Sequence, residues 1–412
     1  MGTVRESFPA LQHRDFRLLW LGQLVSTSGS MMHNAAILWH VALLVPEGQR
    51  AAALGLVGLV KFVPIVVFSL ISGVVADALD RRKLMLWTQA AMALVAGILA
   101  WVTFRGLDSV WPLYALTGLL SAAGSFDGPA RQSLIPKLVP AHHFANAISL
   151  NTILFQIAAV AGPMLAGLAI ASLGLGWVYA LNALSFLFVI GALFAMKPLP
   201  PQPAEDRVAI SFASAWEGLA WVFRAPLIRS SMLLDFFATF FASAMALLPI
   251  FAVDVLHVGE RGYGILVAAP AIGAVVASLW MTRHAEDIVR RGQVLLWSVA
   301  AYGLATIAFG LSTNFVLTFA CLALTGVADT VSMVLRNVIR QLATPDRMRG
   351  RMTGVNMVFF MGGPQLGEVE AGFVAQAFGP VFSVVSGGIG CIVATAWLAW
   401  RTPELRGYRR TE

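Results

Sequence analysis

The chain has 412 residues, of which 58% are hydrophobic and only 12% are charged, and its formal net charge is +7. A soluble protein of this length could not cover so much apolar surface with so few charges. Composition therefore excludes an ordinary soluble protein. The long apolar runs do not alternate as barrel strands would, so we predict an all-α polytopic membrane protein.

Neither the positive charge nor the two cysteines predicts a further ligand. A charge of +7 raises the question of nucleic acid, but the cations fall in loops between apolar runs without a basic-aromatic surface. Cys321 and Cys391 lie apart, inside apolar runs. Their placement argues against a disulfide framework and against a metal site. We expect no nucleic-acid partner and no metal.

Twelve apolar runs are each long enough to supply the roughly 20 residues of a membrane-crossing helix. They form two sets of six. The first set is Phe16–Val45, Ala51–Ala76, Leu84–Phe104, Val110–Val139, Phe144–Leu173 and Val178–Met196. The second set is Leu227–Leu256, Tyr263–Met281, Val294–Leu311, Phe315–Leu342, Met352–Phe378 and Val381–Trp400.

A charged hairpin orients the chain. Two carboxylates and three cations fall within seven residues, Asp77 to Lys83, between the second and third runs. So much charge cannot lie among lipid tails, so this segment must face water. Loops on the opposite side hold only Arg50, Arg105 and Arg261. By the positive-inside rule the hairpin and both termini are therefore cytoplasmic, and the first span is an uncleaved anchor.

A linker divides two predicted bundles. Residues 1–197 form the first six-helix bundle and 227–412 the second, with 198–226 between them. Four prolines between Lys197 and Arg207 favour an extended, solvated segment. The run Phe212–Arg224 is amphipathic and too short to span, so we place it flat at the cytoplasmic interface.

The two halves resemble each other in sequence. Arg131 and Arg336 are 205 residues apart, as are Pro140 and Pro345. In the fifth and eleventh spans a Gly-Pro pair followed by a glycine also recurs. These residues are Gly162, Pro163 and Gly167, and Gly363, Pro364 and Gly367. The order predicts a duplicated six-helix unit, and the Gly-Pro pairs either bend their helices or only allow close packing.

Two six-helix halves, a proline-rich linker and a charged hairpin after the second span resemble the major facilitator superfamily of transporters. The signature Gly-x-x-x-Asp-x-x-x-Arg-x-Lys/Arg of that family is matched by Gly73, Asp77, Arg81 and Lys83. The Gly162-Pro163 segment resembles its antiporter motif, with Ala158 and Ala166 in place of two glycines.

A narrower branch of the superfamily, containing the enterobactin exporter and macrolide-efflux proteins, is also similar. The similar segments are Phe16–Ser26, Arg131–Pro140 and Ala145–Ala147. The substrate does not follow from this similarity.

The resemblance implies a cytoplasmic gate. In the family the hairpin Asp caps a helix N-terminus of the other half, which stabilises an anion by ~0.3–2 kcal/mol, and it pairs with an Arg of the fourth span. Arg131 is the best partner for Asp77, and Asp127 is expected in a local salt bridge to Arg131, four residues on. The alternative is that these charges only set topology. Under the gate hypothesis, the gate residues are Gly73, Asp77, Arg81, Lys83, Asp127, Arg131 and Arg336.

Ionisable or polar residues inside spans are candidates for proton coupling or for a substrate cavity, because burying them in lipid is costly. We favour Asp235, Asp329 and Glu368 as proton carriers. Glu368 is preferred to Glu370 because the two lie about 200° apart around the helix and cannot both face one cavity. The alternative is structural hydrogen bonding between helices. The full candidate set is Asp235, Asp329, Glu368, Glu370, His33, Asn34 and Lys61.

The leading hypothesis is a secondary active transporter that exports a small amphipathic molecule, such as a drug or siderophore, by proton-coupled alternating access. Its partners would be the substrate, protons and the lipid bilayer, with no cofactor besides the proton gradient. It would act as a monomer in the bacterial cytoplasmic membrane. A lipid flippase or an importer of the same fold is the alternative. A membrane-embedded enzyme or sensor is disfavoured, because no catalytic or phosphate-binding motif occurs.

Overall fold

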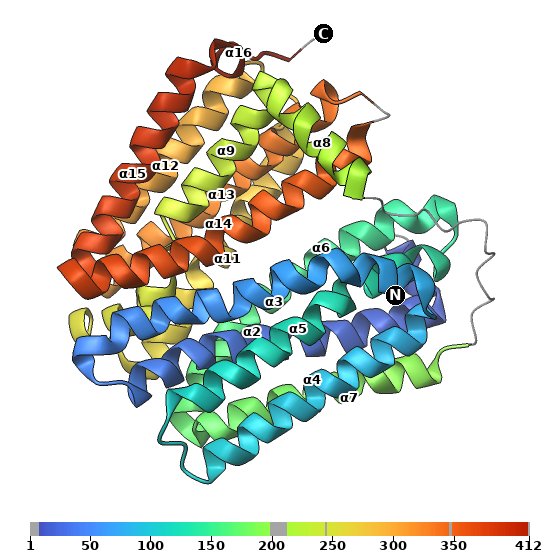
Figure 1. Ribbon diagram of the computed structural model, residues 1–412, viewed down its shortest axis with the longest axis vertical. Coiled ribbons are helices and arrows are strands. Elements are labelled where there is room, and N and C mark those ends of the chain that lie inside the picture. Colours follow the sequence, from blue (N-terminus) through green and yellow to red (C-terminus); the bar gives the residue numbers. More distant parts are fainter. Residues whose placement is uncertain (1–7, 198–211, 244, 346–347, 411–412) are drawn as a thin grey trace. The chain divides into compact units, whose positions relative to one another are not determined.

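The computed structural model describes residues 8–197, 212–243, 245–345 and 348–410 (Figure 1). Within these ranges the side chains of 69–71, 73–78, 212–216, 218, 350 and 358 are not described. Twelve long helices account for most of the described chain. They are α2 (Arg14–Leu44), α3 (Arg50–Ala78), α4 (Arg81–Phe104), α5 (Val110–Leu134), α6 (Phe144–Leu173), α7 (Leu175–Ala195), α9 (Pro226–Phe241), α11 (Gly259–His284), α12 (Arg291–Leu311), α13 (Phe315–Ala343), α14 (Arg349–Phe378) and α15 (Pro380–Arg401).

Nine segments of the described chain are long and apolar enough to cross a membrane, judged by length and composition. The three long helices outside that group are α2, α5 and α14. These helices carry many of the polar candidates, including His33, Asp127 and Glu368. These polar residues contribute to the lower hydropathy of the three helices.

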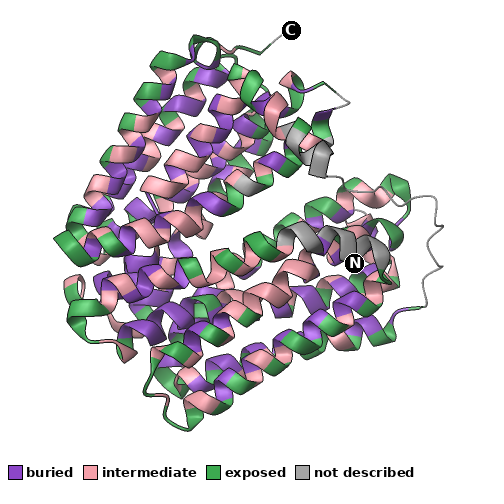
Figure 2. Ribbon diagram, viewed as in Figure 1, coloured by how far each residue is buried: buried purple, intermediate pink, exposed green. Residues whose placement is uncertain are grey.

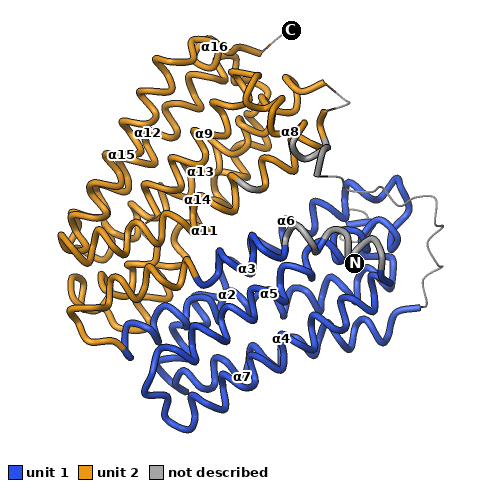
Figure 3. The backbone as a smooth tube through the Cα atoms, viewed as in Figure 1, with its two compact units in different colours: residues 1–44, 60–209 blue, residues 45–59, 210–412 orange. Residues whose placement is uncertain are grey.

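The chain forms two compact units (Figure 3). Unit 1 is Met1–Leu44 with Val60–Ala209, and unit 2 is Val45–Leu59 with Ile210–Glu412. The first turns of α3 thus belong to unit 2, whereas the bundle predicted for residues 1–197 includes all of α3. Within unit 2, a Cβ on Gly55 would lie 2.9 Å from the Cα of Gly372 on α14. Only glycine permits this backbone-to-backbone approach.

The same packing recurs in each unit taken by itself. In unit 1, α2 packs on α5, α6 and α7, and α4 packs on α5 and α7. In unit 2, α9 packs on α13, α14 and α15, and α12 packs on α13 and α15. Numbered along each half, these pairs correspond: the first helix with the fourth, fifth and sixth, and the third with the fourth and sixth. The second helix differs, because in unit 2 α11 also packs closely on α13. The predicted duplication of a six-helix unit is confirmed.

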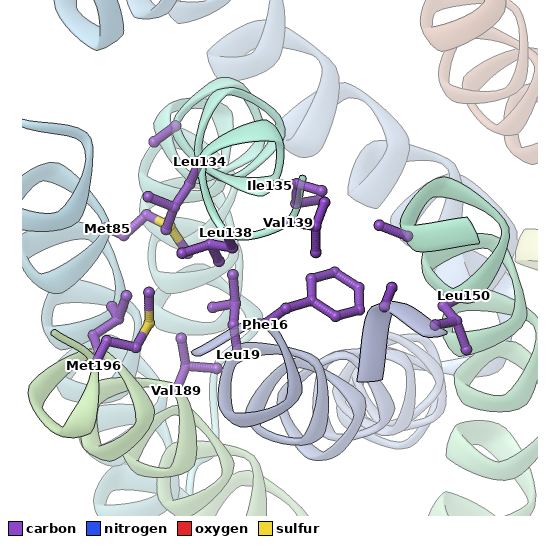
Figure 4. Close-up of a cluster of buried hydrophobic side chains, with 14 of the residues drawn as sticks. Phe16, Leu19, Met85, Leu134, Ile135, Leu138, Val139, Leu150, Val189 and Met196 are labelled. Atoms are coloured by element: carbon purple, nitrogen blue, oxygen red, sulfur yellow. The ribbon is translucent and has the colours of Figure 1, made fainter. Parts of the chain in front are cut away.

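Apolar side chains fill the helix interfaces and also cover the outside. In unit 1 a buried cluster joins Phe16 and Leu19 of α2 to Met85 of α4 and Val189 of α7 (Figure 4). On the outside, Trp87 is 76% exposed, and many apolar residues on other helices are similarly exposed (Figure 2). Helices that are apolar on all sides are typical of a protein whose solvent is lipid.

Two predicted spans are less regular than their sequence pattern. The fourth, expected to Val139, ends as an α-helix at Leu134 and continues as the 3-10 turn η3 (Ile135–Lys137), where Pro136 has no N–H to extend the ladder. The seventh is α9, followed beyond residue 244 by η6 (Met245–Leu247), α10 (Leu248–Ile250) and a π-helical turn, η7 (Phe251–Val255). Its length is confirmed, but the helix is interrupted.

The predicted amphipathic segment is a helix with the expected bounds, α8 (Phe212–Arg224). Val222 of α8 is buried against Met232 of α9 and Met352 of α14. The described apolar residues of α8 therefore pack on unit 2, and its position at a membrane interface stays a prediction.

The two Gly-Pro motifs lie where the fifth helix of each half packs on the first. A Cβ on Gly162 of α6 would lie 2.5 Å from the Cβ of Met31 and 2.8 Å from the carbonyl O of Ser28 on α2. A Cβ on Gly367 of α14 would lie 2.8 Å from the carbonyl O of Thr239 on α9. Both helices run unbroken through their prolines. These contacts support the packing interpretation, and helix bending stays a prediction.

Gly162→Ala is therefore expected to destabilise the protein, by about 1–3 kcal/mol, because the added methyl group has no room against α2. The matched control is Gly191→Ala, at a helical glycine with no atom near the added Cβ, where alanine should be neutral or slightly stabilising. Thermal unfolding in detergent measures both. Equal midpoints for the two variants would contradict the close packing of α6 on α2.

Candidate functional site

A buried ion cluster in unit 2 contains three of the predicted site residues. Arg336 of α13 is 1% exposed. Its Nη2 lies 3.0 Å from Oδ1 of Asp235 on α9 and 3.3 Å from Oδ1 of Asp329 on α13. One guanidinium nitrogen thus bridges two carboxylates, one of them on a different helix.

A second arginine completes the cluster. Nη1 of Arg340 lies 3.9 Å from Oδ2 of Asp235 and also donates to Oδ1 of Asn356 on α14. Nη2 of Arg340 donates to Oδ1 of Asn337 at 2.8 Å. Two cations and two anions balance, which is the condition under which charges are tolerated in an apolar interior.

The cluster forms because α13 carries its charged residues on one side. Asp329, Arg336 and Arg340 are separated by seven and then four residues, spacings that place side chains on one helical face. Apolar neighbours, including Leu234 of α9 and Leu335 of α13, belong to the buried cluster around them. The Arg336–Asp235 pair is thereby shielded from water, so its electrostatic attraction is only weakly screened.

The two carboxylates differ in access. The Asp235 side chain is 3% exposed, whereas the Asp329 side chain is 45% exposed. In addition, Nε and Nη1 of Arg336 are buried and have no hydrogen-bond partner within the described part of the chain. Asp329 is therefore the more exposed carboxylate of the cluster.

Unit 1 repeats the arginine of this cluster with a different partner. Arg131 of α5 is the counterpart of Arg336, each on the fourth helix of its half. Nη1 of Arg131 donates to Oε1 of Gln23 on α2 at 2.8 Å. The link again joins the fourth helix to the first, but its acceptor is a neutral amide instead of a carboxylate.

The predicted local salt bridge between Asp127 and Arg131 is wrong. Asp127 is 7% exposed, and its Oδ1 accepts hydrogen bonds from Nε2 of Gln89 at 2.9 Å and Oγ1 of Thr88 at 3.2 Å. Both donors are on α4. Although the two charged residues are one turn apart, Asp127 is held by α4 and Arg131 by α2.

The polar candidates of α2 separate into buried and exposed residues. His33 is 2% exposed and lies edge-on to Tyr179 of α7, and no described residue hydrogen-bonds to either of its ring nitrogens. His40 Nδ1 lies 3.1 Å from the hydroxyl of Tyr179. Asn34 is exposed, and Lys61 on α3 is half-buried. His33, His40 and Tyr179 thus form a second buried polar group, in unit 1.

The two glutamates of α14 are separate from the ion cluster. Glu368 and Glu370 are both half-buried. Within unit 2, a Cβ on Gly58 would lie 2.9 Å from the Cβ of Glu368. The preference for Glu368 over Glu370 as a proton carrier stays a prediction.

The hairpin motif is described only in part. The surroundings of Gly73 and the side chain of Asp77 are outside what the structure describes. Nη1 of Arg81 donates to the carbonyl O of Ser133 at 2.9 Å, and Lys83 is exposed. Asp80, which lies within the motif, caps the N-terminus of α4 by accepting from the backbone N–H of Arg82 at 2.9 Å.

Sequence reasoning missed Arg340, Asn356 and Gln23 as members of these networks. The first could have been found from its i+4 spacing to Arg336. The other two are neutral residues that are identified only by the helix opposite. Within the part of the chain that the structure describes, no group of three or more His, Cys, Asp or Glu could hold a metal ion.

Comparisons with known proteins agree with this architecture. The family model described as transmembrane secretion effector matches residues 5–407. The enterobactin exporter EntS of Escherichia coli O1:K1 is 26% identical over 400 residues, which cover 97% of this chain and 94% of that protein. EntS of Citrobacter koseri is 26% identical over 401 residues, with the same coverage.

Solved structures share the fold at lower sequence identity. A bacterial homologue of the human lysosomal transporter Spinster, inward-facing and unoccupied, has a TM-score of 0.75 at 14% identity, covering 97% of this chain and 99% of that one. The POT family transporter PepTSo has a TM-score of 0.72 at 13% identity, covering 96% and 98%.

Twelve long helices of the described chain in two repeated units, together with the family match and these relatives, define the class of protein: a secondary transporter with the major facilitator fold. The proteins compared are named as exporters and transporters, in agreement with the expectation that this chain is not an enzyme. The chain belongs to the transmembrane secretion effector family.

Arg336→Leu is expected to destabilise the protein by about 3–5 kcal/mol, because it leaves Asp235 buried without its closest cation. Asp235→Leu combined with Arg336→Leu should recover most of that loss, since the double variant restores charge balance. Arg351→Leu is the control: its partner Glu217 is 61% exposed, and such surface pairs contribute up to about 1 kcal/mol. Unfolding midpoints in detergent test the set, and additive losses in the double variant would show that the pair is not coupled.

Proposed function

We propose that the chain is a proton-coupled exporter of a small amphipathic organic molecule, and that the Arg336 cluster carries the proton. The membership of the family supports export, and relatives named as enterobactin exporters favour a siderophore-like substrate. A bacterial cytoplasmic membrane, cytoplasmic termini and a monomeric state belong to the same proposal.

The observation that carries the proposal is that an accessible and an inaccessible carboxylate share one arginine. Asp329 is 45% exposed at its side chain and Asp235 is 3% exposed, and both lie within 3.3 Å of Arg336. A carboxylate that exchanges protons with water, while touching a buried charge pair, can transmit its protonation state to helix packing. A fully buried pair alone could not.

Protonation of Asp329 would change the cluster from neutral to a net positive charge. An unbalanced charge in an apolar interior is costly, so the interactions between α13 and α9 would rearrange. Arg336 would keep Asp235 and release Asp329. In a protein with two conformations, a difference of this kind biases the equilibrium between them, which is the requirement for coupling.

Asp329→Asn should therefore uncouple transport from the proton gradient. We expect substrate movement driven by a pH gradient to fall at least about tenfold, equivalent to about 1.4 kcal/mol, while exchange of substrate without a gradient persists. The measurement is transport in proteoliposomes, with the candidate siderophore or drug inside or outside. Glu260→Gln, at a half-buried carboxyl group of unit 2 outside the candidate set, is the control and should stay near the wild-type rate.

Full gradient-driven transport by Asp329→Asn would reject the assignment of the proton to this cluster. Loss of activity in both variants, with exchange also lost, would indicate damage to the fold. Transport that ignores the gradient in the wild-type protein would reject proton coupling itself.

A further inference from the structure

The end of the chain is fastened to the loop between α11 and α12. The backbone N–H of Gly292 donates to the carbonyl O of Tyr408 at 3.0 Å, and that of Arg410 donates to the carbonyl O of Val289 at 2.9 Å. The guanidinium of Arg410 also donates to the carbonyl O of Glu286. Just before Tyr408, the short helix α16 (Pro403–Arg406) packs on α12 and α15 (Figure 1).

This arrangement collects unpartnered arginines at one end of unit 2. Three carboxylates, those of Glu286, Asp287 and Glu404, lie in the same segments, so the cations remain in excess. Five exposed arginines here make no side-chain hydrogen bond and no ion pair to any described residue. They are Arg283, Arg290, Arg401, Arg406 and Arg409.

Arg291, the first residue of α12, is a stronger indication of a ligand. It is 9% exposed, its Nε is buried without a hydrogen-bond partner, and no described carboxylate lies within ion-pair distance. No side chain caps the N-terminus of this helix, which is 21 residues long. A buried guanidinium and a helix N-terminus both favour an anion. The carbonyl O of Tyr408 accepts one N–H of this terminus, that of Gly292, but no described anion lies beside Arg291.

Arginines that only set topology need not lack hydrogen-bond partners. In unit 1 the corresponding hairpin uses its cations internally. Arg81 donates to the carbonyl O of Ser133 at 2.9 Å, and Arg82 donates to that of Lys197 at 3.5 Å. The five exposed unit 2 arginines differ from these and from Arg410, because no described backbone carbonyl accepts a hydrogen bond from their side chains.

Exposed tryptophans lie close in sequence to these arginines. Trp280, three residues before Arg283, is 48% exposed; Trp297 of α12 is 75% exposed; and Trp400, next to Arg401, is 73% exposed. Exposed tryptophan is enriched where a membrane meets water. A hollow of about 450 Å³ beside Trp280 is lined by Leu279, Trp280, Thr282, Arg283 and His284.

We propose that this surface is a binding site for anionic phospholipid. The phosphate would lie at the N-terminus of α12, held by Arg291 and Arg290, with Arg409 of the fastened tail beside it. Guanidinium groups bind phosphate oxygens in pairs and are weakly hydrated, which suits them to this boundary. The acyl chains would lie along the exposed Trp297 face and the hollow beside Trp280.

The test compares short-chain phosphatidylglycerol with phosphatidylcholine as additives to the full-length protein in neutral detergent. Apparent affinity is read from the shift of the thermal unfolding midpoint during titration. Phosphatidylglycerol should bind more tightly. Arg291→Gln should weaken this preference about fivefold, and Arg290→Gln with Arg409→Gln about fivefold for each arginine. The second variant spares the buried residue and keeps the test valid if Arg291→Gln does not fold.

Controls separate a lipid site from general charge. Arg105→Gln with Arg261→Gln removes two other exposed arginines and should keep the full preference for phosphatidylglycerol. Arg290→Lys with Arg409→Lys keeps the charge and should retain most of that preference. No preference in the wild-type protein, or an equal loss in the control pair, would overturn the proposal. Inorganic phosphate or glycerol phosphate reproducing the whole shift would overturn it in favour of a free-anion site.

Discussion

A charge inside a bilayer needs a counter-charge or hydrogen bonds, and the interior of both units follows from this constraint. In unit 2, Arg336 is enclosed by apolar side chains and meets two carboxylates. In unit 1, Asp127 has no described cation within ion-pair distance, and an amide and a hydroxyl from α4 take that place. Apolar residues can face outwards without a comparable cost, because the surrounding solvent is lipid. Polar pairing therefore acts together with apolar packing to fix how these helices are rotated about their axes.

The features that the sequence predicted were those that depend on local pattern. The length of each apolar run predicted the twelve long helices, and α6 and α8 begin and end at the predicted residues. The 205-residue offset predicted that Arg131 and Arg336 are counterparts, and each indeed links the fourth helix of its half to the first. These properties need no knowledge of which helix lies opposite.

The properties that escaped prediction depend on the helix opposite. Spacing along α5 allowed Asp127 to pair with Arg131, but α4 and α2 offer each of them a separate partner. Spacing along α13 did not show that Asp235 of α9 would meet Arg336. The interruption of the seventh span after Phe241 has the same character, since Ser243 donates to the carbonyl O of Pro364 on α14, a residue far away in sequence.

The duplicated fold uses one arginine position for two chemical purposes. Gln23, the acceptor of Arg131 between α5 and α2, is a neutral amide without an acidic proton to exchange. The acceptors of Arg336 are carboxylates, one of them half-exposed, and they can. Under the proposed function, two units with similar helix packing would thus differ in sensitivity to protons at equivalent places. In a transporter that alternates between two states, this asymmetry would make the α9–α13 link the responsive one and the α2–α5 link the constant one against which it works.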